Sequence, residues 1–276
     1  MKTLGSILKM SVEFVGSRRC AEELLAHVLG KKRLDLYLSF DQPLEEREIA
    51  LLRPLLQRAK RGEPLQYILG MVDFYGCSIA VSREVLIPRP ETELLVDEIV
   101  KQLRGLPLEG SLFWDLCAGS GCIGIAVKKA LPALEVELLD LSPEALALAK
   151  ENVARNGLPI VCRQGDLFAA CGDKKAHFLA CNPPYVSTSE FSTLQDSVRN
   201  WEPKMALVGG VDGLDFYRRL SREAPERLHS GARLFLEIGA SQGEAVLALF
   251  STPPWKEVRL AKDLAGHPRF IFLERD

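Results

Sequence analysis

Four consecutive residues, Asn182, Pro183, Pro184 and Tyr185, directly follow an apolar run at residues 176–181 that is typical of a buried strand. Two adjacent prolines remove two backbone donors and favour an extended Asn182, so the chain leaves the strand in a defined direction. The Asn182 side chain and the carbonyls of Asn182 and Pro183 are hydrogen-bond acceptors, and Tyr185 adds a flat ring with a polar tip. This arrangement suits a planar NH2 group, although Asn-Pro is also common in turns that bind nothing.

A glycine-rich turn is the second motif, and it runs from Asp115 to Gly124 with the sequence DLCAGSGCIG. Its glycines allow the backbone to approach a ligand closely, and a helix that begins here offers free N–H groups. We therefore expect a cofactor site that includes Cys117, Ala118, Gly119, Ser120 and Gly121. The spacing also satisfies a dinucleotide fingerprint, so a nicotinamide-dependent oxidoreductase is one alternative.

Three acidic residues lie at the ends of three successive predicted strands. Asp140 stands where a carboxylate can bind both hydroxyls of a ribose. Asp115 would be a poor neighbour for a pyrophosphate but a good one for a cationic group. Asp166 is placed to accept from an adenine amino group, with Leu167 or Phe168 against the ring. S-adenosylmethionine carries a sulfonium and an ammonium but no phosphate, so the acids favour it over a dinucleotide.

These motifs together resemble class I S-adenosylmethionine-dependent methyltransferases that act on planar nitrogen. Three further segments, VLIPRPETE at 85–93, EPKMALVGGVDGL at 202–214 and DLAG at 263–266, resemble the PrmC/HemK family, the N5-glutamine methyltransferases of peptide chain release factors. The resemblance covers the chain from about residue 20 to its last residue. Cys117 departs from it, because the family usually has glycine there, and a cysteine would be strained if the position needs a positive φ.

The resemblance implies methyl transfer from S-adenosyl-L-methionine to the side-chain amide nitrogen (N5) of the glutamine in the Gly-Gly-Gln loop of a release factor, with S-adenosyl-L-homocysteine as product. Asn182 Oδ1 and a backbone carbonyl of the Asn182-Pro183 segment would accept the amide hydrogens and aim the nitrogen at the methyl group. Asn182 and Pro183 are therefore the expected catalytic residues, while Pro184 and Tyr185 complete the substrate wall. Asn182 also borders the cofactor, and no general base is needed before transfer.

The nearest alternative enzyme is an adenine-N6 methyltransferase acting on DNA or RNA, since an exocyclic NH2 group is also planar and weakly nucleophilic. Such an enzyme has to flip a base out of its stack and bind a phosphate backbone. A net charge of −2 and a pI near 6.2 disfavour binding of a phosphate backbone. A non-catalytic release-factor-binding protein is disfavoured by the intact Asp115, Asp140 and Asn182. We therefore expect release factors as partners, with no stable nucleic acid binding and no membrane binding.

The length of 276 residues allows one or two domains, and we expect two. Residues 1–70 show a helical period, as at 21–29 and 44–61, and form the expected helical substrate-recognition domain. Period-two alternation around Gly76 predicts a β-hairpin, so residues 71–90 are the expected connector. Residues 91–276 are the expected catalytic domain, in which the long segment 186–212 is a candidate lid that reads the substrate.

Short apolar runs in the catalytic domain alternate with helical stretches such as 144–156, which predicts an α/β fold with a mostly parallel sheet covered on both faces. Together with the resemblance, this predicts a class I methyltransferase fold with seven strands. The loop between the last two runs is too short for a crossover helix, so the last strand should be antiparallel. The runs are 112–116, 136–139, 160–163, 178–181, 234–238, 258–261 and 270–273.

The seven cysteines are odd in number and include no C-x-x-C pair, which predicts reduced thiols and a cytoplasmic location. None of the four histidines has ligand-like spacing, so we expect no metal site. The first 16 residues lack the apolar core of a signal peptide, and no apolar stretch is long enough to cross a membrane.

Overall fold

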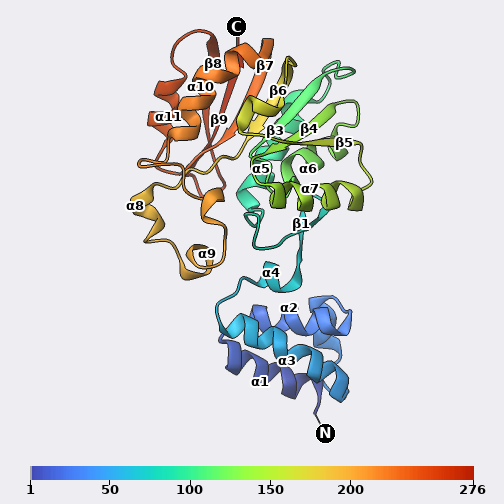
Figure 1. The fold of residues 1–276 in the computed structure, drawn as a ribbon. Coiled ribbons are helices and arrows are strands. Elements are labelled where there is room, and N and C mark those ends of the chain that lie inside the picture. The colour runs from blue at the N-terminus through green and yellow to red at the C-terminus, as the bar shows by residue number, and fades with distance from the viewer. Residues whose placement is uncertain (1) are drawn as a thin grey trace. The chain divides into compact units, whose positions relative to one another are not determined.

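The computed structural model describes residues 2–276, and the chain forms two compact units. The helical unit contains the residues up to Met71 together with Gln195–Trp201. The α/β unit contains Val72–Leu194 and Glu202–Asp276 (Figure 1). The return of Gln195–Trp201 to the helical unit has no signature in the sequence, since these residues lie far along the chain from the helices with which they cluster.

The helical unit is built from amphipathic helices that bury their apolar faces together. Thr3 and Ser17 cap the first two helices by accepting backbone N–H bonds, and Gly16 and Gly30 end them in the left-handed conformation. The shared core includes Leu4, Leu24, Leu25, Leu36 and Leu52. The elements are α1 (Leu4–Val15), α2 (Arg18–Leu29), η1 (Arg33–Leu38), α3 (Glu46–Lys60), α4 (Leu65–Leu69) and α9 (Asp196–Arg199).

A two-stranded hairpin of β1 (Met71–Phe74) and β2 (Cys77–Ala80) follows. Tyr75 and Gly76 between the strands both have positive φ, 46° and 72°, which matches the twist of a tight hairpin. The fully buried Asn152 accepts from the Ala80 N–H at 2.7 Å and donates to the Ala80 carbonyl at 3.0 Å. These two bonds attach the hairpin to a helix of the α/β unit.

A seven-stranded sheet forms the centre of the α/β unit, with the order β5-β4-β3-β6-β7-β9-β8. The strands from β3 to β7 are parallel, and β9 is antiparallel to both neighbours, so the predicted fold is confirmed. The strands are β3 (Leu112–Leu116), β4 (Glu135–Asp140), β5 (Ile160–Gln164), β6 (Ala176–Cys181), β7 (Leu228–Glu237), β8 (Trp255–Lys262) and β9 (Pro268–Arg275).

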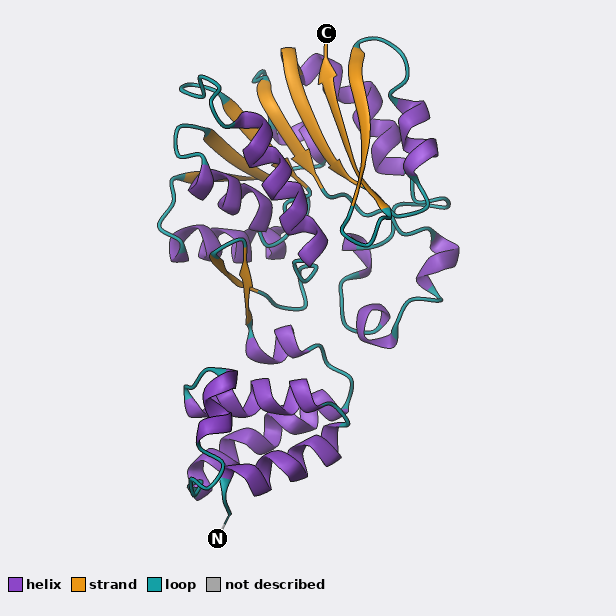
Figure 2. Ribbon diagram, turned by 180° about the vertical axis from the view of Figure 1, so that it is seen from behind, coloured by secondary structure: helices purple, strands orange, loops and turns teal. Residues whose placement is uncertain are grey.

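Helices cover both faces of this sheet, as Figure 2 shows. One group contacts β3, β4, β5 and β7, and the other contacts β4, β7, β8 and β9. The first group is α5 (Pro90–Leu103), α6 (Cys122–Ala130) and α7 (Pro143–Arg155). The second group is α10 (Asp215–Arg227), α11 (Gly243–Leu249) and η2 (Leu167–Ala170). The connection from β6 to α10 holds α8 (Thr188–Phe191), α9 and η3 (Lys204–Ala206).

The strand order reverses at β3, which has β4 on one side and β6 on the other. In open α/β sheets such a reversal leaves a crevice at the carboxyl ends of the strands. Leu116, Asp140 and Cys181 end the three strands and therefore meet at this crevice. All seven cysteines are free thiols, and within residues 2–276 no helix is both long and apolar enough to cross a bilayer.

Candidate active site

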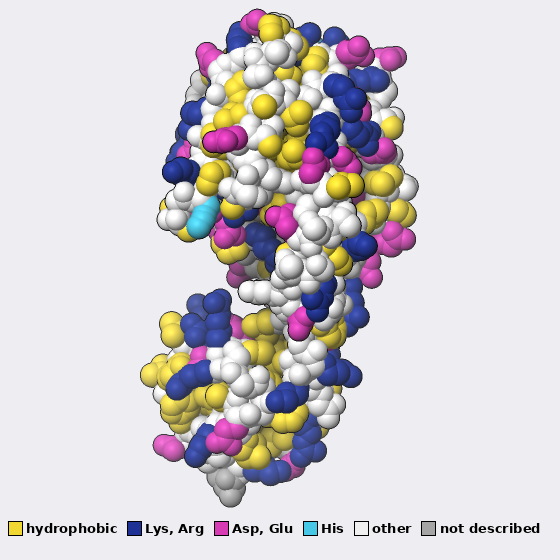
Figure 3. Space-filling view, turned by 90° about the vertical axis from the view of Figure 1, so that its left-hand side faces the viewer, with side chains coloured by type: hydrophobic (Ala, Val, Ile, Leu, Met, Phe, Trp, Pro, Cys, Tyr) yellow, Lys and Arg dark blue, Asp and Glu magenta, His cyan; other side chains and the backbone are white. Residues whose placement is uncertain are grey.

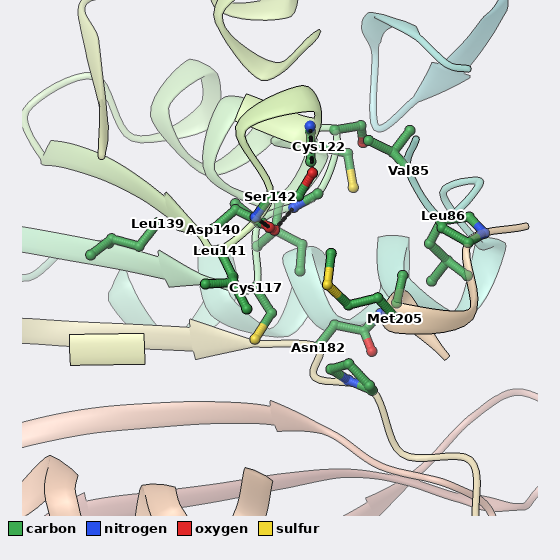
Figure 4. A pocket seen from close by; sticks show the side chains of 18 of the residues that line it. Val85, Leu86, Cys117, Cys122, Leu139, Asp140, Leu141, Ser142, Asn182 and Met205 are labelled. Carbon is green, nitrogen blue, oxygen red and sulfur yellow. Dashed lines mark hydrogen bonds between the residues drawn. The ribbon is translucent and has the colours of Figure 1, made fainter. Parts of the chain in front are cut away.

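A pocket that is open to solvent lies at the carboxyl ends of β3, β4 and β6. Figure 4 shows Cys117, Asp140 and Asn182 around it, each just beyond or at the end of one of these strands. The expected site residues that line it are Cys117, Ala118, Gly119, Ser120, Asp140, Asp166, Leu167, Asn182 and Pro184.

Four expected site residues do not line the pocket: Asp115, Gly121, Pro183 and Tyr185. Asp115 is fully buried behind the turn, and its Oδ2 accepts from the Gly124 N–H at 2.8 Å. Its Oδ1 has no hydrogen-bond partner among residues 2–276. Burial raises the pKa of the Asp115 carboxyl to about 7. Asp115 therefore holds the turn from behind in this structure.

The glycines of the turn divide into two kinds by what surrounds them. A Cβ on Gly121 would lie 2.7 Å from Leu138 Cδ1, and a Cβ on Gly124 would lie 2.3 Å from Leu138 Cδ2. These two glycines allow α6 to pack closely on β4. Gly119 has a φ of +55°, and no atom of the described residues lies within 4 Å of its Cβ direction, so its backbone faces open pocket space. The fingerprint spacing thus reflects helix packing as well as ligand approach.

Cys117 has a φ of +56°, in the left-handed region that non-glycine residues rarely adopt. We expect Cys117→Gly to raise the free energy of unfolding by about 1 kcal/mol, because the left-handed conformation costs a residue with a Cβ that much. Urea denaturation measures the change. Cys117→Ala removes the thiol but keeps the Cβ, so it should show no gain. An equal gain in both variants would point to the thiol as the cause.

Asp140 organises the wall of the pocket opposite Asn182. Its Oδ2 accepts from the Gly119 N–H at 2.8 Å and its Oδ1 from the Ser142 N–H at 2.9 Å. Burial raises the pKa of this carboxyl, and the two backbone N–H groups oppose that rise. Each oxygen keeps a second lone-pair direction for a ligand hydroxyl. Leu141, which sequence reasoning missed, is 52% exposed and presents its apolar side chain to the same pocket.

Asp166 lies at the far wall and is already paired. Its Oδ1 is 2.8 Å from Arg219 Nη1, and the carboxylate side chain is 50% exposed. Leu167, which follows, is buried with a φ of +50°. One carboxylate oxygen of Asp166 thus pairs with Arg219 on α10, while the apolar Leu167 continues the pocket wall.

The Asn182 side chain has one satisfied end and one unsatisfied end. Its Nδ2 donates to Thr92 Oγ1 at 3.4 Å, and Thr92 in turn donates to Glu237 Oε2 at 2.7 Å. The Asn182 Oδ1 is shielded from solvent and has no hydrogen-bond partner among residues 2–276. An acceptor left unpaired at a pocket wall is a site for a ligand donor.

The backbone after Asn182 is held by close contacts with the segment from Gly209 to Gly213, here called the glycine segment. Gln242 Nε2 donates to the Tyr185 carbonyl at 2.8 Å. A Cβ on Gly209 would lie 2.2 Å from the Pro184 carbonyl oxygen, and a Cβ on Gly213 would lie 2.2 Å from the Tyr185 carbonyl oxygen. Only glycine fits at these two positions, so the glycine segment packs directly against the Pro-Pro turn and fixes its position.

Two other segments, residues 85–93 and 202–214, also line the pocket, and a buried carboxylate joins them. Glu202 is 5% exposed; its Oε2 accepts from the Ile87 N–H at 3.1 Å, and its Oε1 pairs with Arg89 Nη2 at 2.6 Å. Leu86 and Met205, one from each segment, line the pocket near Asn182 (Figure 4). The sequence marks both segments through the resemblance, but it assigns no role to these residues.

Two family models match the chain. The PrmC N-terminal domain matches residues 15–70, and the methyltransferase small domain matches residues 90–200. The first match falls on the helical unit. The second covers the glycine turn, the three acids and Asn182 in the α/β unit.

Curated relatives align with nearly the whole chain. The release factor glutamine methyltransferase of Geobacter sulfurreducens is 41% identical over 269 residues, which are 98% of this chain and 93% of the relative. The protein of the same name from Thermodesulfovibrio yellowstonii is 37% identical over 276 residues, which are 100% of this chain and 99% of the relative.

Solved structures show the same fold at low sequence identity. A methyltransferase from Pyrococcus furiosus matches with a TM-score of 0.54 and 14% identity, over 72% of this chain and 89% of that chain. A 16S rRNA methyltransferase from Thermus thermophilus, solved with AdoMet and guanosine, matches with a TM-score of 0.52 and 15% identity, over 75% of this chain and 50% of that chain.

Proposed function

The chain belongs to the family of release factor glutamine methyltransferases, and from this premise we propose that its pocket binds S-adenosyl-L-methionine and holds the reacting amide against Asn182. The enzyme transfers a methyl group to the side-chain amide nitrogen (N5) of a glutamine in peptide chain release factors. The Gly-Gly-Gln loop carries that glutamine in our proposal. The observation that supports the site is the buried Asn182 Oδ1 at the pocket wall, which has no hydrogen-bond partner among the residues that the structure describes.

The residues of the pocket fit this methyl donor. Asp140 has lone pairs for two ribose hydroxyls, and Leu141 and Leu167 offer apolar walls for the adenine ring. Of the lining residues that the structure describes, Arg89 alone is basic, and it pairs with Glu202. A pyrophosphate would lack a free cation here, so the pocket favours a nucleoside donor over a dinucleotide. When bound, the donor supplies an electrophilic methyl group on a sulfonium.

The chain itself supplies acceptors and geometry. An amide nitrogen is a poor nucleophile because its lone pair is delocalised into the carbonyl. Asn182 Oδ1 accepts one amide hydrogen in our proposal, and a backbone carbonyl of the Asn182-Pro183 segment accepts the other. Both acceptors favour the positive charge that builds on the nitrogen. S-adenosyl-L-homocysteine is the leaving group, and the nitrogen loses one proton to water after the transfer. The rigid Pro-Pro turn, with Pro184 at the pocket and Tyr185 packed behind it, holds them in place and contributes through orientation.

The assay that tests this function uses methyl-labelled S-adenosyl-L-methionine with release factor, DNA and RNA in separate reactions. We expect label on release factor alone, and no label when its loop glutamine is replaced. Label only on nucleic acid would instead support an adenine-N6 methyltransferase. On the face in Figure 3, Asp and Glu side chains lie among the Lys and Arg side chains, a mixture that disfavours binding of a phosphate backbone by this face.

Asp140→Ala is expected to weaken binding of S-adenosyl-L-methionine on the order of 100-fold. Hydrogen bonds to a charged group contribute roughly 1.5–3 kcal/mol each, and the variant also leaves the Gly119 N–H without its acceptor. Isothermal titration calorimetry of the full chain measures the affinity. Asp173→Ala, at an exposed loop carboxylate, is the control and should bind like wild type. Equal affinity in both variants would remove the ribose role from Asp140.

The remaining parts of the chain are proposed to serve substrate recognition. Residues 1–70 form the recognition domain, 71–90 the connector and 91–276 the catalytic domain in this proposal, with residues 186–212 as a substrate-reading segment. That segment contributes Gln195–Trp201 to the helical unit. Because release factors act in translation, we also place the enzyme in the cytoplasm.

A further inference from the structure

We propose that Thr92 and Glu237 are positioning residues that set the orientation of the Asn182 amide, so that its oxygen and not its NH2 group faces the reacting amide. This inference rests on the proposed function of Asn182. It goes further by assigning roles to two buried residues from other elements, α5 and β7.

The three side chains form a chain of hydrogen bonds with a defined direction. Glu237 is the last residue of β7 and is 1% exposed, and Thr92 in the first turn of α5 is 2% exposed. Thr92 has a single hydroxyl proton, and the 2.7 Å bond to Glu237 Oε2 uses it. Toward Asn182, Thr92 therefore presents only lone pairs.

The orientation of Asn182 follows from that polarity. An amide can turn either its NH2 group or its oxygen toward Thr92, and the two ends are nearly equal in size. With the NH2 group toward Thr92 the contact is a hydrogen bond at 3.4 Å. With the oxygen toward Thr92 two acceptors would face each other. The carboxylate thus selects, through Thr92, the orientation that leaves Asn182 Oδ1 available.

The protonation state of Glu237 controls this selection. A protonated Glu237 can donate to Thr92 Oγ1, and the Thr92 hydroxyl can then donate to Asn182. That bond stabilises the opposite orientation, in which the Asn182 oxygen faces Thr92. Burial raises the pKa of the Glu237 carboxyl to about 7, while the Thr92 bond opposes the rise. The charged and titratable groups that act on or respond to Glu237 are Arg89 and Glu91 at the start of α5, Arg269 on β9, Cys122, Tyr185 and Tyr217.

The expected pH profile follows from the sign of this equilibrium. Turnover should be low at acidic pH and should rise as Glu237 loses its proton, with a midpoint near pH 7. Glu237→Gln cannot ionise and should lower kcat and abolish this limb of the profile. Glu244→Gln, at an exposed glutamate in the first turn of α11, is the matched control and should keep the profile.

Two substitutions at Thr92 separate orientation from packing. Thr92→Val keeps the shape but removes the hydroxyl, and we expect kcat to fall on the order of 10- to 100-fold, with KM for S-adenosyl-L-methionine unchanged. Thr92→Ser keeps the hydroxyl and should restore kcat to within about threefold of wild type. Thr252→Val, in an exposed loop, is the control for the loss of a threonine hydroxyl.

Methyl transfer to release factor by the full chain is the readout, with folding checked by circular dichroism. Absence of transfer by wild type would refute the proposed function itself. If wild type transfers the methyl group and Thr92→Val keeps a normal kcat, only the orienting role is overturned. The same holds if Thr92→Ser and Thr92→Val lose kcat equally. A change confined to KM for S-adenosyl-L-methionine would also overturn it. If Thr92→Val does not fold, the pH profile of Glu237→Gln provides the test. A fall of turnover below pH 7 that persists in this variant would contradict the proposal.

Discussion

Asn182→Ala should lower kcat for methyl transfer on the order of 100-fold and leave binding of S-adenosyl-L-methionine close to wild type. The side chain contributes the Oδ1 acceptor that has no partner among residues 2–276. Removing one group that stabilises charge in a transition state typically costs roughly 100- to 1,000-fold in kcat. Single-turnover transfer to release factor measures the rate, and calorimetry measures cofactor affinity.

Asn182→Asp sharpens this test because it keeps the size of the side chain. The variant has no NH2 group, so a carboxylate oxygen would face the lone pairs of Thr92 Oγ1. We expect a loss of kcat comparable with that of the alanine variant. Near-normal turnover in Asn182→Ala would show that the proposed acceptor has no role in catalysis.

Gly213→Ala should reduce both stability and turnover, although the substitution lies outside the pocket lining. The new Cβ would lie 2.2 Å from the Tyr185 carbonyl oxygen and 2.6 Å from Gln242 Nε2, and the residue has a φ of +77°. A backbone carbonyl cannot move aside as a side chain does, so the Pro-Pro turn must shift. Overpacking costs roughly 1–3 kcal/mol, and a displacement of about 1 Å at the reacting groups can cost 100-fold in rate.

Gly231→Ala is the matched control for this second prediction. Gly231 has nearly the same φ, +76°, but within residues 2–276 no atom lies within 4 Å of its Cβ position. Backbone strain alone should lower its free energy of unfolding by about 1–2 kcal/mol, with turnover unchanged. Urea denaturation and the transfer assay compare the two. If both variants lose the same stability and keep full turnover, the glycine segment does not brace the active-site turn.

The fold was predictable because its signals are local. Alternation of apolar runs and helical stretches marks each strand, and the short loop before Phe270 marks the antiparallel end. β7 begins at Leu228, well before the apolar run at 234–238 from which this strand was predicted. Its first residues include the exposed His229, Ser230 and Gly231, which carry no strand pattern.

The site was predictable only in part, because several of its contacts depend on tertiary structure. Asp140 and Asn182 stand at strand ends in recognisable motifs, and both line the pocket. Asp115 stands in the same motif, yet its carboxylate turns to the Gly124 N–H and is buried. Thr92 and Glu237 are 145 residues apart in the chain, so no local pattern could reveal their contact.

The close fit of the glycine segment is also invisible in a sequence read alone. Gly209 and Gly213 look like ordinary turn glycines until their neighbours are known. Their requirement comes from the carbonyls of Pro184 and Tyr185, which approach from another part of the chain. Resemblance to a family marked this segment, but only the folded structure shows which atoms exclude a side chain.

The return of Gln195–Trp201 to the helical unit has a practical consequence for dissecting the protein. The chain passes from one unit to the other three times, so neither unit is encoded by one uninterrupted stretch of gene. A fragment that stops at Met71 omits part of its own unit, and a chimaera that exchanges only the first 71 residues would combine helices from one parent with the returning segment of the other. Recombinant fragments and domain swaps should therefore carry both pieces.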